Sequence, residues 1–274
     1  MTTETKMQQF EGEFAALGPD AAEFYDTLEE NTGSRQLPAG SLPVWKFPGS
    51  GNNRWVREDS SGVKHFEDSL VGVVLAQTTQ RSMYLSGYDG GGEFPDCQSP
   101  DGITGYPHTD RDTNVVNNIA YAKDGSEIRF GGACESCPLN QWDSAAAIGK
   151  QGKGKACTEY RLGVMQRPDQ PTPEGFRLPP TALKAWGNIG LEMARTGNRL
   201  SRTVLELSLV IPPNENLAQL NVRPLGFLPK DVADQLKAIA PDIKRPQLAA
   251  PTEPEYVPPP LGEEGDADPD DLPF

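Results

Sequence analysis

Four cysteines constrain this chain more than any other feature of its sequence. Their spacing is C-x36-C-x2-C-x19-C, at Cys97, Cys134, Cys137 and Cys157. A C-x2-C knuckle lets two thiolates approach one ion across a tight turn, and two thiolates from elsewhere complete the tetrahedron that zinc prefers. Turn-forming residues flank the knuckle, namely Gly131, Gly132 and Pro138. The spacing therefore predicts a structural Zn²⁺ bound by all four thiolates.

Two other interpretations of the cysteines stay open at this point. An iron–sulfur cluster would use the same four thiolates, and the cysteines would also suit a group of buried thiols without a metal. His65 and His108 are possible substitute ligands. Four thiolates leave no coordination position for water, so a zinc ion here would stabilise the fold and would not catalyse a reaction.

The remaining sequence indicates a cytoplasmic protein. No apolar run reaches the roughly 18 to 20 residues that span a bilayer, and the first residues lack the basic and apolar segments of a secretion signal. We therefore expect no membrane partner. In a reducing compartment the cysteines are better suited to metal binding than to disulfides.

The net charge of −14 describes the ends of the chain more than its middle. Residues 1–30 carry eight acids and one lysine, and residues 250–274 carry eight acids and no base. The residues between them hold 23 acids and 24 bases. A basic surface that binds nucleic acid is therefore compatible with the overall acidity.

Periodicity and composition divide the chain into three parts. We expect an acidic helical N-terminal arm over residues 1–32, a folded core over 33–240, and a disordered acidic tail over 241–274, where Pro, Ala, Glu and Asp dominate. Within the core, helical spacing predicts helices over Thr181–Thr196 and Pro229–Ala240. Short apolar or alternating segments predict five strands, which fit a small barrel: Leu70–Ala76, Arg81–Leu85, Glu127–Phe130, Tyr160–Met165 and Thr203–Ile211.

Basic and aromatic residues of the core suggest contacts with single-stranded nucleic acid, which is bound by rings that stack on bases inside a basic groove. Lysines alternate with glycines over residues 149–155, which favours contact with phosphates, although Ala156 rules out a Walker A loop. The candidate phosphate-binding lysines are Lys150, Lys153 and Lys155. The other candidate contacts are Arg54, Trp55, Arg57, Arg81, Tyr84, Arg129, Phe130 and Arg161.

The last residues carry a family resemblance. An acidic stretch ends in Asp270, Asp271, Leu272, Pro273 and Phe274, which resembles the C-terminal tip of bacterial single-stranded DNA-binding proteins. Such a tip places a terminal Phe in an apolar pocket and its carboxylate beside a basic residue. The resemblance implies that these five residues recruit replication and repair proteins. The body is more similar to large single-stranded DNA-binding proteins of bacteriophages.

Resemblance and strand count together imply a mainly β (α+β) protein with an OB-like barrel, a zinc-stabilised insertion, flanking helices and a disordered tail. We expect a non-enzymatic protein that coats single-stranded DNA during replication, recombination or repair, in the bacterial cytoplasm if it is encoded by a phage. The alternative is a zinc-containing adaptor or transcription regulator that acts through protein contacts. A metalloenzyme would need a carboxylate cluster, for which Asp110 and Asp112 beside His108 are the nearest approach.

Overall fold

A computed structural model describes residues 10, 13–14, 23–24, 26–31, 42–48, 51–85, 95–108, 118–150 and 154–239. Its strands are β1 (Val44–Lys46), β2 (Trp55–Glu58), β3 (Lys64–Glu67), β4 (Ser69–Met83), β5 (Cys97–Ser99), β6 (Thr104–Pro107), β7 (Ile119–Tyr121), β8 (Glu127–Arg129), β9 (Gly132–Ala133), β10 (Thr158–Gln166), β11 (Glu174–Leu178), β12 (Thr203–Val210) and β13 (Gln219–Phe227). Its α-helices are α3 (Ser144–Ala147), α4 (Leu183–Arg195) and α5 (Lys230–Ile239). Its 3₁₀ helices are η1 (Pro138–Asn140), η2 (Pro180–Ala182) and η3 (Leu200–Arg202).

Eleven of the strands form one sheet, in the order β3-β2-β1-β11-β10-β4-β5-β6-β9, with β12 joining β4 and pairing with β13. Strands β7 and β8 form a separate hairpin. The mixed, strand-rich class is confirmed. The strand pairs between described residues leave the sheet open, in contrast to the closed barrel that we predicted. Trp55 of β2 nevertheless donates a hydrogen bond to the Leu207 carbonyl of β12, at 2.9 Å, so the sheet curls around its core.

The main core lies between the curled sheet and α4. Leu70 and Val74 of β4 point into it, together with Phe176 of β11 and Trp186 of α4. On the opposite side of β4, Val73 packs with α5 and with Phe14 of the N-terminal arm, which is 1% exposed. The first half of β4 packs against a core on each face, which explains why its sequence there is almost continuously apolar.

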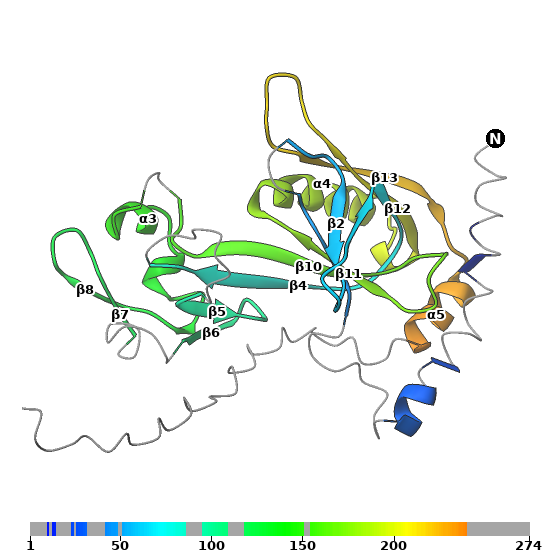
Figure 1. Cartoon of the computed structure of the whole chain (residues 1–274), viewed down its shortest axis with the longest axis horizontal. Coiled ribbons are helices and arrows are strands. Elements are labelled where there is room, and N and C mark those ends of the chain that lie inside the picture. Colours follow the sequence, from blue (N-terminus) through cyan, green and yellow to red (C-terminus); the bar gives the residue numbers. More distant parts are fainter. Residues whose placement is uncertain are drawn as a thin grey trace, which may run out of the picture.

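Strand β4 joins two parts of the molecule. Residues 73–82 of β4 pair with β10, residues 69–73 pair with β12, and the last three residues pair with β5. Figure 1 shows the long β4–β10 ribbon running from the main body to a smaller part that holds β5–β8 and α3. We call this smaller part, the described residues of 84–157, the cysteine lobe. The chain enters the lobe after β4 and returns directly into β10.

Most predicted elements of the core are present, with shifted ends. Helices α4 and α5 lie where periodicity placed them, and β8, β10 and β12 fall on predicted strands. The segments Leu70–Ala76 and Arg81–Leu85 were wrongly separated, because polar residues 77–80 pair with β10 and continue β4. The described residues of the N-terminal arm are helical, and the tail over 241–274 lies outside the described residues. No helix in the described part of the chain has the length and apolar character needed to span a membrane.

Candidate metal centre and nucleic-acid surface

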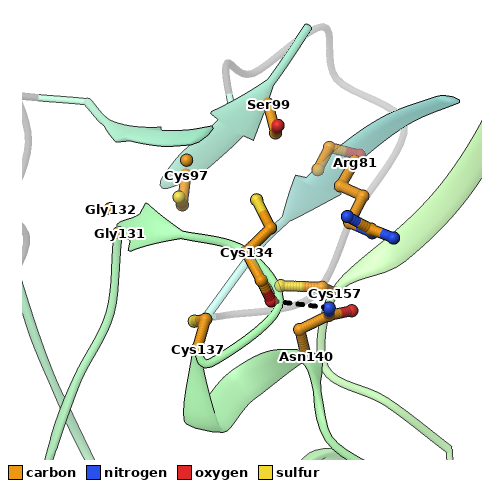
Figure 2. Close-up of a pocket in the computed structure, with 11 residues that line it drawn as sticks. Arg81, Cys97, Ser99, Gly131, Gly132, Cys134, Cys137, Asn140 and Cys157 are labelled. Carbon is orange, nitrogen blue, oxygen red and sulfur yellow. Dashed lines mark hydrogen bonds between the residues drawn. The ribbon is translucent and has the colours of Figure 1, made fainter. Parts of the chain in front are cut away.

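The four cysteines come from four places in the cysteine lobe and line one small pocket. Cys97 begins β5, Cys134 follows β9, Cys137 precedes η1, and Cys157 precedes β10. Figure 2 shows the four side chains around the same space. Cys97, Cys134 and Cys137 are each no more than 8% exposed, and all four thiols are free of disulfides.

Backbone and amide hydrogen bonds fix the segments that carry the thiols. The Cys134 N–H donates to the Ile103 carbonyl at 2.7 Å, and the Cys157 N–H donates to the Leu139 carbonyl at 3.0 Å. The buried Asn140 amide donates to the Cys134 carbonyl at 2.7 Å, across the knuckle, as the dashed line in Figure 2 marks. The knuckle is therefore tied both to β6 and to the strand that follows Cys157.

Glycines let the chain pass close to the thiols. Gly131 has φ +91°, and a Cβ on it would lie 2.7 Å from Pro107 Cγ. A Cβ on Gly105 would lie 3.1 Å from the Cys97 sulfur. Any other residue at these two positions would push β6 or the knuckle away from the pocket.

The thiols influence one another electrostatically. Burial, followed by the charges of Cys137 and Cys134, raises the pKa of the Cys97 thiol to about 12. A hydrogen bond to Cys137, followed by burial, raises the pKa of Cys157, whereas the same bond lowers the pKa of Cys137 to about 6. Backbone N–H groups of Leu139 and Asn140 also favour the Cys137 thiolate. Four thiolates would repel one another here unless a cation neutralised them.

Four thiols are a suitable donor set for zinc, although the four sulfur atoms do not yet converge on one ion position. Within the described residues, no three His, Cys, Asp or Glu side chains are gathered tightly enough to hold an ion as they stand. Binding would require the side chains to turn toward a common centre, as metal sites form when the ion binds. Neither histidine lines the pocket, and His65 instead pairs with Asp59 at 2.8 Å.

The predicted phosphate-binding lysines have different surroundings. Lys150 is half-buried; burial lowers its pKa, and the charges of Cys157 and Asp96 oppose this shift. Lys155 is partly exposed near α3, and Lys153 lies outside the described residues.

The structure removes two aromatic candidates and assigns partners to three arginines. Trp55 is 0% exposed in the main core and Phe130 is 5% exposed in the cysteine lobe, so neither ring is open to a base. Arg57 pairs with Glu174 at 2.8 Å. Arg81 pairs with Glu159 at 3.1 Å, and Arg54 with Asp68 at 2.8 Å.

The other predicted contacts are less constrained. Arg129 is exposed on β8, and Tyr84 and Arg161 are partly exposed. The Arg161 Nε is buried without a hydrogen-bond partner. The tip residues Asp270, Asp271, Leu272, Pro273 and Phe274 lie outside the described residues, as do Asp110 and Asp112.

Sequence reasoning missed a row of side chains on one face of the sheet. Strand register pairs Phe66 with Val56, Val56 with Lys46, Lys46 with Arg177, and Arg177 with Leu162. Paired residues point to the same side of a sheet, so these five residues form one row across β3, β2, β1, β11 and β10. We call it the sheet-face row. The signal could have been found only by knowing the strand order, because its members are far apart in sequence.

The sheet-face row combines cations with rings. Lys46 is exposed, Phe66 is 44% exposed, and the Arg177 guanidinium lies 4.0 Å from the centre of the Tyr160 ring on the same face. Within the described part of the chain, neither Lys46 nor Arg177 pairs with a carboxylate. The row therefore offers two free positive charges next to aromatic surface.

Comparisons with known protein families, with curated proteins and with solved structures found no match to this chain.

Proposed function

We propose that this protein binds single-stranded DNA through the sheet-face row and that a zinc ion held by the four cysteines stabilises the inserted cysteine lobe. The observation that carries the proposal is the row itself, where two adjacent cations without ion pairs among the described residues, Lys46 and Arg177, lie in line with the exposed Phe66 and beside the Tyr160 ring. Cations bind the phosphate backbone and rings stack on unpaired bases, which is the combination that single strands require.

Charge distribution supports the same function. The acidic residues that make the chain negative gather at its two ends, and Arg57, Arg81 and Arg167 are held by carboxylates. Lys46 and Arg177 remain available on one face. The C-terminal tip would recruit replication or repair proteins, as its resemblance implies, and this role is separate from the DNA contact.

Fluorescence anisotropy of a labelled oligo-dT tests the proposal. Wild-type protein should bind at low salt, and Lys46→Glu with Arg177→Glu should weaken binding by at least about tenfold. Loss of two phosphate contacts should also reduce the slope of log affinity against log salt concentration by about 1.4. The matched control reverses two exposed cations of α4, as Lys184→Glu with Arg195→Glu, and should bind nearly as wild type. If neither wild type nor a truncation before Pro251 binds oligo-dT, the proposed function is wrong.

A further inference from the structure

Trp142 differs from the other three tryptophans of the chain. Trp45, Trp55 and Trp186 are each at most 4% exposed in the main core, whereas Trp142 is 76% exposed in the cysteine lobe. Its chain neighbours Gln141 and Asp143 are exposed polar residues. A large indole held alone in solvent among polar neighbours contributes little to packing.

The backbone on both sides of Trp142 is firmly held. Before it, Asn140 is bonded to the Cys134 carbonyl, and the Leu139 carbonyl accepts the Cys157 N–H. After it, the buried Ser144 hydroxyl donates to the Leu139 carbonyl at 2.9 Å and accepts the Ala156 N–H at 2.9 Å. The exposed ring therefore projects from a fixed loop that belongs to the cysteine knuckle.

The residue after Trp142 adopts a conformation that L-residues seldom take. Asp143 has φ +65° and ψ −2°, in the left-handed region, and α3 begins immediately after it. Such a conformation costs on the order of 1 kcal/mol or more for a non-glycine residue and tends to occur at functional sites. This turn separates the Trp142 ring from the helix that follows.

Lys155 lies beside the same loop. The Ala145 N–H donates to the Gly154 carbonyl at 3.1 Å, and Ala156 is bonded to Ser144, so Lys155 runs along the start of α3. Lys155 has no ion pair within the described residues. Exposed Glu135 and Asp143 reduce the positive potential here, so ring stacking must supply most of any binding energy.

We propose that Trp142 is a base-stacking residue for single-stranded DNA, positioned by the cysteine knuckle, with Lys155 beside it for a phosphate. This inference rests on the proposed function and adds a contact in the cysteine lobe to the sheet-face row. A single planar ring between polar residues fits a flat base on its face. An apolar protein surface would instead need a continuous apolar patch around the ring.

Intrinsic fluorescence offers a direct test, because Trp142 alone among the tryptophans meets solvent. Titration of wild-type protein with unlabelled oligo-dT should quench the solvent-exposed part of the emission, and Trp142→Phe should remove this change. Trp142→Ala should weaken binding of labelled oligo-dT by about 5- to 100-fold. Trp142→Phe, which keeps a ring, should recover part of the affinity. Phe227→Ala, which removes another exposed ring, should leave affinity unchanged.

Treatment with a chelator tests whether the cysteine knuckle positions the Trp142 ring. Removal of zinc should lower the emission anisotropy of Trp142 and abolish its quenching by oligo-dT. Metal content and circular dichroism of each variant show whether the lobe is intact. If labelled oligo-dT binds the wild type while Trp142 emission is unchanged and Trp142→Ala binds equally well, the inference is wrong and the proposed function stands. If no oligo-dT binds, the proposed function fails and the inference fails with it.

Discussion

The main core and the cysteine lobe bury side chains of different kinds. The main core gathers sixteen buried residues, including three tryptophans, between a curled sheet and α4. The buried cluster of the lobe has seven residues, of which two are cysteines and two are alanines. Burial of apolar area supplies roughly 25 cal/mol per Å², so the lobe gains far less from its core than the main body does.

We propose that a metal at the cysteines compensates for this difference. Small folded units that cannot bury enough apolar surface need a metal or a disulfide, and the lobe has four free thiols around one pocket. The main body has no such need. We therefore expect perturbations of the thiols and of the tryptophans to unfold different parts of the molecule.

The largest expected effect is that of Cys137→Ser or of metal removal. Structural zinc binds small domains with about 10 to 16 kcal/mol of apparent free energy, so the lobe should lose more than about 5 kcal/mol of stability. Hydrogen exchange should rise sharply over β5–β9 and remain low over α4 and β12. Ser136→Ala, beside the knuckle, is the control, since its hydroxyl makes only a 3.4 Å bond to the Ala133 carbonyl. A wild-type protein without bound metal would contradict this expectation.

Trp186→Ala should have the converse effect on the main core. It removes a ring that packs against Phe176, with centroids 5.4 Å apart, and donates to the Gln77 amide oxygen at 2.8 Å. The free energy of unfolding in urea should fall by about 3 to 5 kcal/mol, with metal content unchanged in the folded protein. Leu191→Ala, at an exposed position of the same helix, should change the free energy of unfolding by less than about 0.5 kcal/mol. Loss of metal in Trp186→Ala would mean that the two parts fold as one unit.

Zinc affinity should rise with pH. The pKa of Cys97 is raised to about 12 and that of Cys157 is also raised, so both thiols are protonated near neutral pH and must lose their protons when the ion binds. Each released proton should strengthen binding about tenfold per pH unit. Calorimetry in buffers of different ionisation enthalpy counts the protons, and zinc binding without proton release would refute the expectation.

Asn140→Ala should weaken the lobe more mildly. It leaves the buried Cys134 carbonyl without its side-chain donor, which costs about 1 to 3 kcal/mol, and should lower zinc affinity about 10- to 100-fold. Competition with a chromogenic chelator measures this affinity. Gln141→Ala, which removes an exposed bond to the Glu135 carbonyl, should leave zinc affinity nearly unchanged. Equal effects of the two variants would argue against the knuckle geometry.

The smallest expected effect is at the surface of the main body. Hydrogen bonds from His65 and Ser61 hold the pKa of Asp59 well below its ordinary value of 3.8. A depressed folded pKa gives stability that is present above pH 3.8 and is lost as the pH falls below it. Asp59→Asn should therefore lower Tm slightly at pH 7, with a gap to wild type that narrows toward pH 3. An equal Tm difference between the variant and wild type at pH 7 and pH 3 would exclude a contribution from the Asp59 carboxylate. The metal content of the variant should equal that of wild type.

The two parts of the molecule also differ in how far the sequence predicts them. Helix α4 and strand β12 follow from apolar periodicity, because each buries one regular face. Strand β11 was missed because Glu174 and Gly175 interrupt its apolar pattern. Glu174 is nevertheless buried, and its carboxylate pairs with Arg57 and accepts a hydrogen bond from Trp45. Strand β13 contains Pro224 and many exposed residues, so its local pattern gives little indication of a strand.

The candidate contacts show the same limit. Cysteine spacing predicted thiols that do line one pocket, since a knuckle is a local motif. Interleaving of arginine and aromatic residues could not tell Trp55, which is buried, from Trp142, which is exposed. Lys46 and Arg177 become neighbours only through the parallel pairing of β1 with β11, and no local pattern carries that information.

The return of the chain from the lobe has a consequence for protein engineering. Thr158, the first residue of β10, pairs with Ser82 near the end of β4, so the lobe departs and returns through neighbouring positions. A two-residue turn of the Asn-Gly type in place of residues 83–157 would link Ser82 to Thr158 in their existing register and close β4 and β10 into a β-hairpin. Such a shortened chain would keep the pairings among β1–β4 and β10–β13. The excised lobe could in turn be inserted between the two strands of a β-hairpin in another protein.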